Sequence, residues 1–226
     1  MIVRILAVLL SLGLFAALGL ALLERPVPAE NLPARVTEAL PASGVEHSVT
    51  AVLLNLRSFD TLLEIGVLLL AAVVALALHE SQADPGRRMG LANPLLHAVM
   101  SWLLPLMLLV AAYLLWAGST QAGGAFQAGA VLAATGVLLR LAGVLLPGFS
   151  QSWRMRALLA AGLAVFIAAG AVPTLSGRAF LAYPEGFVSA MILGIEFALA
   201  LSIGAALFSL FKLVPPHASR GDKSGE

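Results

Sequence analysis

The chain has 226 residues, of which 60% are hydrophobic and only 11% are charged, against about 25% charged residues in an average globular protein. So few polar side chains exclude a soluble globular particle, and the absence of cysteine excludes disulfides, thiolate catalysis and cysteine-bound metal centres. The net charge of +1 includes no basic stripe with interleaved aromatic residues, which argues against a nucleic-acid partner.

A membrane-spanning helix needs about 20 predominantly apolar residues. Six stretches approach or exceed this length, namely residues 2–23, 60–78, 97–116, 124–146, 157–172 and 187–213. The fifth of them is the shortest. The first stretch resembles a signal peptide, but its uncharged run is longer than the usual signal core of about 7–15 residues. We therefore predict an all-α integral membrane protein with about six transmembrane helices, the first of them retained.

The lysine and arginine residues predict the orientation of these spans, because cytoplasmic loops are enriched in both. A cytoplasmic amino terminus places eight of them inside, namely Arg4, Arg87, Arg88, Arg154, Arg156, Lys212, Arg220 and Lys223. Four then lie outside, namely Arg25, Arg35, Arg57 and Arg178. The bias predicts that both termini are cytoplasmic.

The segments between the spans also have patterns of their own. In the outer loop 24–59, Pro26, Pro28 and Pro33 predict an extended start. Residues 45–56 are apolar but too few for a span, which favours an interfacial or re-entrant helix, or an outward extension of the second span. The polar residues 80–93 read as a cytoplasmic linker, and residues 214–226 as a disordered cytoplasmic tail.

Two carboxylates, Asp60 and Glu64, stand four residues apart at the start of the second span and therefore share one helix face. Their mutual repulsion favours a proton, and their oxygen atoms suit a hard cation, so the pair suits an ion path. The alternative is structural: Asp60 and Thr61 cap the helix while Glu64 pairs with Arg57.

Glu196 lies deep within the last predicted span, with no lysine or arginine within one helical turn. A buried carboxylate needs a partner from another helix, a bound cation or a proton, which indicates a role in ion transport. The alternative is a protonated carboxyl that hydrogen-bonds to another helix, such as to Ser202 or Thr135. Arg140 is a potential partner, although its side chain can instead extend to the inner interface.

No sequence motif supports an enzyme or a resident metal or cofactor. His79 and His97 near the inner ends of their spans are either proton shuttles or, more commonly, interfacial polar residues. Glycines at helix-packing spacing, Gly162 with Gly170 and Gly194 with Gly204, predict closely packed helices.

The uncharged loop between the third and fourth spans, residues 116–133, is rich in glycine. Glycines at a helix entrance allow tight turns and leave backbone amides available to other groups. A compact outer turn with close helix packing explains much of the pattern.

Two segments resemble the Mrp-type multisubunit sodium/proton antiporter family and its relatives in membrane-bound hydrogenases. Residues 55–64, N-L-R-S-F-D-T-L-L-E, resemble the pattern D-F-R-G-F-D-T-L-G-E at the carboxy-terminal end of the family's A subunit. The resemblance implies a functional role for Asp60 and Glu64. Asn55, Ser58 and Leu63 replace the first aspartate and both glycines of the pattern.

The glycine loop resembles the B-subunit signature G-H-N-x-P-G-G-G-F-x-x-G. It matches at Gly118, Gly123, Gly124, Phe126 and Gly129 and departs at Ser119, Thr120, Ala122 and Ala125. Residues 194–204 are similar to the last B-subunit helix, with Glu196 about where the family has an acid. The resemblance therefore implies an A-end-like region 1–79 joined by 80–93 to a four-helix B-like domain 94–213.

This resemblance implies an accessory subunit of a monovalent cation (Na⁺)/proton antiporter in the cell inner (plasma) membrane, with A-, C- and D-like partners. Asp60, Glu64, Glu196 and Arg140 would contribute to an ion path at a subunit interface, and the glycine loop would shape a helix contact. The alternatives are a membrane-arm subunit of a hydrogenase-like redox-driven complex, a structural scaffold, or a free-standing transporter.

Overall fold

The computed structural model describes residues 2–24, 31–80, 94–143, 153–183 and 186–212, which fall into two compact units, Met1–Arg35 and Val36–Glu226. The first unit contains α1 (Ile2–Leu23), an apolar helix with no buried stretch. All further elements except the start of α2 (Leu32–Ala39) belong to the second unit. Pro33 lies in the first turn of α2, where proline is tolerated, so the predicted extended start of the loop is wrong at this residue.

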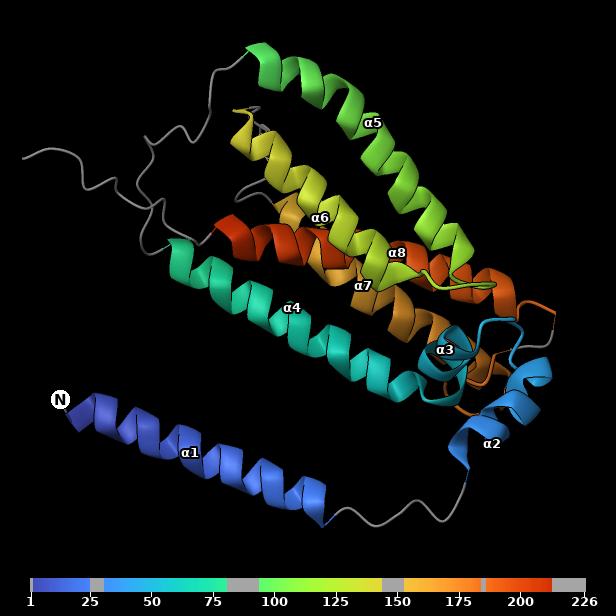
Figure 1. Cartoon of the computed structure of the whole chain (residues 1–226). Coiled ribbons are helices and arrows are strands. Elements are labelled where there is room, and N and C mark those ends of the chain that lie inside the picture. Colours follow the sequence, from blue (N-terminus) through green and yellow to red (C-terminus); the bar gives the residue numbers. More distant parts are fainter. Residues whose placement is uncertain (1, 25–30, 81–93, 144–152, 184–185, 213–226) are drawn as a thin grey trace, which may run out of the picture. The chain divides into compact units, whose positions relative to one another are not determined.

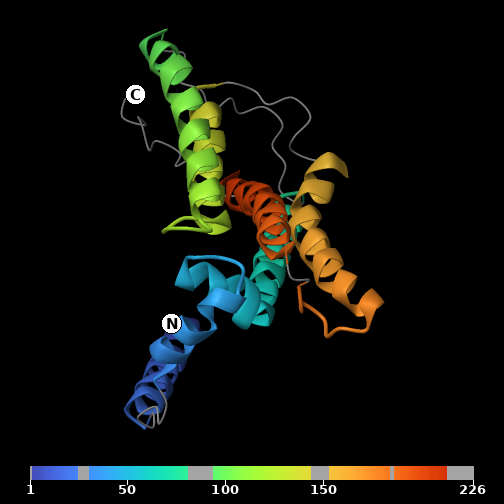
Figure 2. The same ribbon diagram turned by 90° about the vertical axis from the view of Figure 1, so that its right-hand side faces the viewer.

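The second unit is built around α8 (Val188–Lys212), which contacts four other helices (Figures 1 and 2). These are α4 (Ser58–Glu80), α5 (Pro94–Ala117), α6 (Ala125–Leu141) and α7 (Trp153–Ala171). Apolar side chains recur on α8 at helical spacing and are buried against its neighbours: Ile192, Ile195, Leu199 and Ile203. Glu196 lies within this buried pattern.

Within the described residues, five helices are long and apolar enough to cross a membrane, where the sequence predicts about six. The sixth, α6, has 17 residues and spans about 25 Å, somewhat less than the bilayer core of about 30 Å. Residues 144–146 of that predicted span lie outside the described part. The predicted fifth span is too short, because α7 and the 3₁₀ turn η3 (Val172–Ser176) together cover 24 residues.

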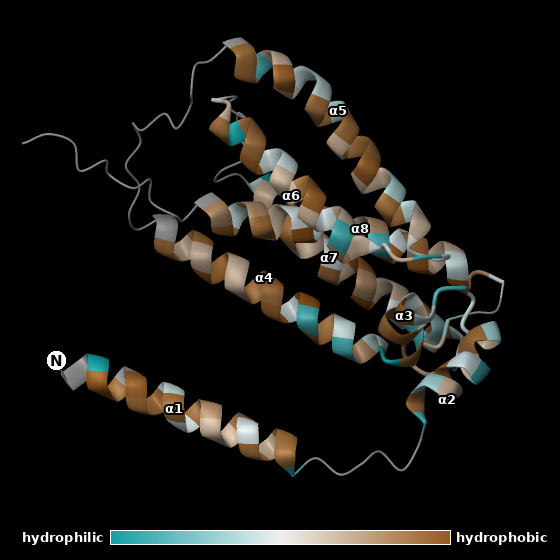
Figure 3. Cartoon of the chain, viewed as in Figure 1, coloured by the Kyte–Doolittle hydropathy of each residue, from teal (hydrophilic) through white to brown (hydrophobic). Residues whose placement is uncertain are grey.

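Many large apolar side chains are exposed on the helices. Figure 3, coloured by hydropathy, shows that apolar residues occupy most of each helix. Leu63, Val67 and Leu70 on α4 are more than half exposed, and so is Trp102 on α5. Such faces require lipid or other membrane subunits around them. The protein is therefore an all-α, multi-pass membrane protein.

The apolar segment predicted over residues 45–56 forms α3 (Ser48–Ala51), which continues directly into a π-helix, η2 (Val52–Leu56). Arg57, with φ −131° and ψ 37°, interrupts the helical path before α4. The segment is thus a distinct helical piece next to α4 rather than an unbroken extension of it (Figure 1).

Candidate functional site

Glu196 lies on the buried face of α8, with only 4% of its surface exposed. Its carboxylate accepts a hydrogen bond from the backbone N–H of Ala125, the first residue of α6. The first amides of a helix have no partner within that helix, and the helix dipole favours a negative charge there. The carboxylate therefore caps α6 from a neighbouring helix. Oε2 has no hydrogen-bond partner among the described residues.

The glycine loop provides the space for this carboxylate. Gly124 has φ 103° and ψ −170°, a backbone conformation almost restricted to glycine, and its N–H donates to the Leu114 carbonyl at 2.8 Å. A Cβ atom on Gly124 would lie 2.6 Å from Glu196 Oε1. One on Gly118 would lie 2.7 Å from Gly124 Cα and 3.3 Å from the same carboxylate oxygen. Both positions must stay free of side chains for Glu196 to occupy its place.

The other matched residues of the loop lie nearby and have different surroundings. A Cβ atom on Gly123 would collide with the carbonyl oxygen of Leu114 at the end of α5. One on Gly129, a turn further along α6, would lie 2.8 Å from Ile203 Cγ2 of α8. Phe126 is partly exposed. Gly123 closes the turn, therefore, and Gly129 brings α6 close to α8.

A cavity of about 80 Å³ lies beside the carboxylate. Its walls come from the α3–η2 segment, the start of α4, the start of α6 and α8, and include Thr50, Leu53, Leu54, Thr61, Gly124, Phe126, Gln127, Glu196 and Leu199. Among these, Glu196 is the ionisable side chain. The structure thus brings together Glu196 and the glycine loop, which are about 70 residues apart in the sequence.

Two buried threonines of this cavity carry no functional prediction from the sequence. The Thr50 hydroxyl donates to the Gly118 carbonyl, and the Thr61 hydroxyl donates to the Leu53 carbonyl at 2.6 Å. The backbone N–H groups of Glu46 and His47 both donate to the Ser119 carbonyl at 2.9 Å, which holds the segment against the loop. Thr50 is a polar residue within the apolar segment 45–56, and this pattern could have indicated that the segment lines a polar site.

Asp60 and Glu64 do not reach this cavity. They lie on the exposed face of α4, whereas Thr61 and Ile65, each one residue further along, lie on its buried face. Asp60 forms an ion pair with Arg57 at 2.5 Å, and both side chains are about half exposed or more. The alternative pairing of Arg57 with Glu64 is therefore wrong. Glu64 is exposed and forms no ion pair within the described part of the chain.

Arg140 also stays apart from Glu196. It lies near the last turn of α6, 15 residues beyond Ala125, which corresponds to about 22 Å along the helix. Its Nη1 is buried and has no hydrogen-bond partner among the described residues. The potential pairing of Arg140 with Glu196 is not formed.

The other polar candidates form local contacts. The Ser202 hydroxyl donates to the Leu159 carbonyl at 2.6 Å, and the Thr135 hydroxyl donates to Val131 at 2.8 Å, so neither bonds to Glu196. His97 Nε2 lies 2.7 Å from the Ala142 carbonyl oxygen, which connects the start of α5 to the end of α6. The side chain of His79 lies outside the described part.

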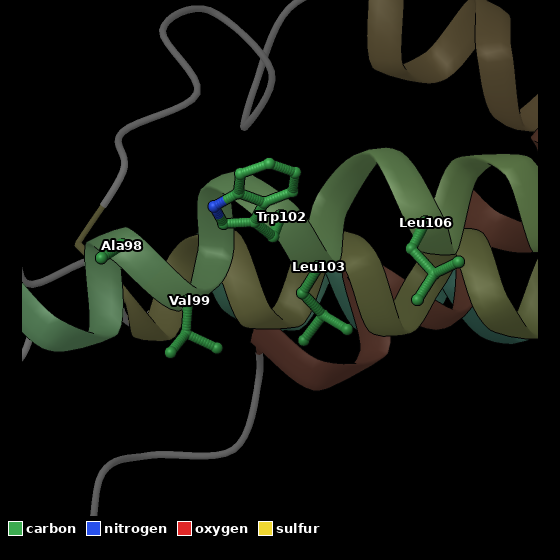
Figure 4. Close-up of a pocket in the computed structure, with 5 residues that line it drawn as sticks. All are labelled: Ala98, Val99, Trp102, Leu103 and Leu106. Carbon is green, nitrogen blue, oxygen red and sulfur yellow. The ribbon is translucent and has the colours of Figure 1, made fainter.

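A larger open hollow of about 490 Å³ runs along one face of α5 and is lined by Ala98, Val99, Trp102, Leu103 and Leu106 (Figure 4). None of the described residues that line it is ionisable. In the part of the chain that the structure describes, no three His, Cys, Asp or Glu side chains gather into a possible metal site.

Two solved structures share this fold. A chain of the Mrp complex from Dietzia sp. DQ12-45-1b is 21% identical with a TM-score of 0.63, over 90% of this chain and 25% of that one. A chain of the membrane-bound sulfane sulfur reductase, an archaeal respiratory membrane complex, is 22% identical with a TM-score of 0.66, over 94% and 98% of the two chains. This chain therefore spans a quarter of the length of the matched Mrp chain.

A comparison with curated proteins found no match. The family model described as a domain related to the MnhB subunit of Na⁺/H⁺ antiporters matches residues 95–213, which is more than half of the chain. These residues contain α5 to α8, the glycine loop and Glu196. The chain belongs to this MnhB-related family.

Proposed function

We propose that the chain is an accessory membrane subunit of a multisubunit monovalent cation (Na⁺)/proton antiporter and contributes to an ion path at a subunit interface. The family match over residues 95–213 supports the type of complex. The position of Glu64 supports the proposed subunit interface, because its carboxylate lies on the exposed, apolar face of α4.

Glu64 follows the start of α4 by six residues, or about 9 Å along the helix. Its outward neighbours Leu63 and Val67 are each 68% exposed. An ionised carboxylate among apolar side chains within a span is costly unless another group pairs with it. A polar group of another subunit, or a passing cation or proton, would supply that partner.

The wider assignment follows from this proposal. The partners would be A-, C- and D-like subunits, and the location would be the plasma membrane with both termini in the cytoplasm. The chain would carry out no enzymatic chemistry and hold no resident cofactor, since Na⁺ and H⁺ would be its transported ions. Asp60, paired with Arg57, would stand at the entrance of the path.

The test is cation-dependent dissipation of a pH gradient in vesicles that contain the complete complex, native or with Glu64→Gln. We expect exchange to collapse in the variant while the subunit still co-purifies with its partners. Glu38→Gln is the matched control, because Glu38 lies on α2 outside the spans and undergoes the same chemical change. Unchanged exchange in Glu64→Gln would instead favour a purely structural scaffold.

A second candidate is a membrane-arm subunit of a redox-driven ion-pumping complex. The match to the sulfane sulfur reductase chain along 98% of its length favours this assembly, because that chain is of similar extent. Absence of cation-dependent exchange in the native complex, together with co-purifying iron–sulfur subunits, would make it the better assignment.

A further inference from the structure

We propose that the cavity beside Glu196 is a binding site for one small monovalent cation such as Na⁺, with Glu196 Oε2 and the hydroxyl oxygens of Thr50 and Thr61 as its ligands. The choice of Na⁺ rests on the proposed function. The site itself rests on the geometry of the cavity, and it lies inside this chain rather than at the subunit interface where Glu64 is exposed.

The first observation is the unpartnered carboxylate oxygen. Oε1 is adjacent to Gly118 and Gly124, and the carboxylate accepts the Ala125 N–H. Oε2 is buried and has no hydrogen-bond partner among the described residues, although the side chain lines a cavity. A buried carboxylate with one unsatisfied oxygen needs a counter-charge or a proton on that side.

The second observation is the set of donor atoms around the cavity. Thr50 and Thr61 direct their hydroxyl protons to the backbone carbonyls of Gly118 and Leu53, so each hydroxyl oxygen keeps a lone pair for a ligand, even where Thr50 also contacts His47. His47 Nδ1 lies 3.4 Å from the Thr50 hydroxyl, and no lysine or arginine is among the described residues that line the cavity. An oxygen-only set around a carboxylate suits a hard cation.

Charge and size select a monovalent ion. The carboxylate contributes one negative charge, and the start of α6 contributes a partial positive charge of about 0.5. A monovalent cation neutralises the carboxylate, whereas a divalent cation would leave a large uncompensated charge in an apolar surrounding. The volume of about 80 Å³ accommodates an ion with one or two water molecules, each of which occupies about 30 Å³ in the liquid.

One wall of the cavity is the π-helix η2, through Leu53 and Leu54. Single π-helical turns are frequent at functional sites, because they displace backbone carbonyls from the regular helical ladder. Here the displaced carbonyl of Leu53 accepts the Thr61 proton and thereby orients that hydroxyl oxygen.

The test measures binding of radioactive sodium to the full chain, together with the subunits that co-purify with it, in lipid nanodiscs. Difference infrared spectroscopy of the same samples reports the protonated carboxyl group. We expect Na⁺ to bind at one site of this chain and to remove the carboxyl signal of Glu196. Glu196→Gln should abolish both effects, and Thr61→Val should weaken binding at least about tenfold.

Glu38→Gln is the matched control, because Glu38 lies exposed on α2 outside the spans, and it should bind Na⁺ as the native chain does. Because Glu196→Gln retains an oxygen acceptor for the Ala125 N–H, its thermal unfolding should stay close to native, and Thr61→Val tests the site with the carboxylate intact. Sodium binding that survives in Glu196→Gln overturns the proposal. So does a carboxyl signal that responds to pH and not to Na⁺, which would indicate a site for protons alone. Either result leaves the Glu64 exchange test unaffected, so the two proposals can fail separately.

Discussion

At the scale of single residues, Gly124 and Glu196 depend on each other through their direct contact at the start of α6. The glycine adopts a backbone conformation that other residues avoid, and the space left by its missing side chain holds Oε1 of the carboxylate. The carboxylate in turn satisfies the first amide of α6. Each residue therefore makes the position of the other possible.

Gly124→Ala should destabilise the protein by about 1–3 kcal/mol from backbone strain alone, and further because its Cβ would displace Glu196. Thermal unfolding in detergent, followed by circular dichroism, measures the effect. Gly177→Ala is the control, since Gly177 also has a positive φ of 73° but nothing lies within 4 Å of its Cβ position. Equal shifts in both variants would contradict the proposed contact with Glu196.

Because Tyr183 is buried, we expect the free energy of unfolding to fall at alkaline pH. It lies between η3 and α8, outside the spans, and burial raises the pKa of its hydroxyl to about 12 from 10.0. Between these two pH values the unfolded chain releases this proton while the folded chain retains it. The free energy of unfolding should therefore fall by about 1.4 kcal/mol per pH unit from Tyr183.

Tyr183→Phe should remove this part of the alkaline loss, and near pH 7 it should be neutral or stabilising, because the buried hydroxyl has no partner among the described residues. Unfolding in denaturant from pH 9 to 12 checks both statements. Tyr113→Phe is the control and should retain the alkaline fall in the free energy of unfolding that Tyr183 causes. An identical pH slope for Tyr183→Phe and the native chain would refute the assignment.

The burial of Glu196 could be predicted from the sequence, because a charge deep in an apolar helix must face protein or water rather than lipid. Its partner could not. Arg140 offered the opposite charge. The actual partner is a backbone N–H, and because every residue except proline has one, the sequence does not show which N–H will bind the carboxylate. Likewise, Asp60 and Glu64 share a helix face as predicted, yet the spacing could not show that this face points outward.

At the scale of helices, α7 and α8 approach closely at Gly162. A Cβ atom there would lie 2.6 Å from Ser202 Cβ, and the Ser202 hydroxyl bonds to the Leu159 carbonyl across the same contact. Small residues permit such approaches in membrane bundles. The predicted packing role also holds for Gly204, which faces Leu132 of α6, but Gly194 has no atom within 4 Å of its Cβ position.

Gly162→Leu should separate α7 from α8 and break the Ser202 hydrogen bond, which costs about 1–3 kcal/mol by overpacking. Titration with a denaturing detergent, followed by circular dichroism, gives the change in unfolding free energy. Gly194→Leu introduces the same side chain on α8 into open space and should leave the unfolding free energy close to native. If both variants unfold alike, the close approach does not contribute to stability.

The positions of the helices could be predicted because long apolar stretches are a strong signal. The residues at which the helices begin and end were harder to predict. The fifth predicted span begins at residue 157, whereas α7 begins at Trp153 and includes Arg154 and Arg156 in its first turn. The π-helix η2 had no signal in its composition. One of its tertiary contacts is with α4, where the Thr61 hydroxyl donates to the Leu53 carbonyl, and a sequence pattern does not show such a contact. The linker 80–93 and the tail 214–226 stay predictions, since residues 81–93 and 213–226 lie outside the described part.

At the scale of the whole molecule, residues 36–80 and the described residues after 93 belong to one packed unit. α4 contacts both α7 and α8, and the α3 segment bonds to the glycine loop through Ser119 and Gly118. A protease site inserted within residues 81–93 should therefore yield two fragments that still co-elute after cleavage. Size-exclusion chromatography in mild detergent tests this, with the uncleaved chain as the reference. Separation of the fragments would mean that the linker, rather than packing, holds the two regions together.

The cavity beside Glu196 has walls from both regions, and this affects how the protein is made. Because one polypeptide carries Thr50, Thr61 and Glu196, translation supplies both walls in a fixed one-to-one ratio. Tethered segments meet at an effective concentration on the order of millimolar, whatever the expression level of other genes. Closure of the cavity is therefore an intramolecular step, in which two parts of one chain come together.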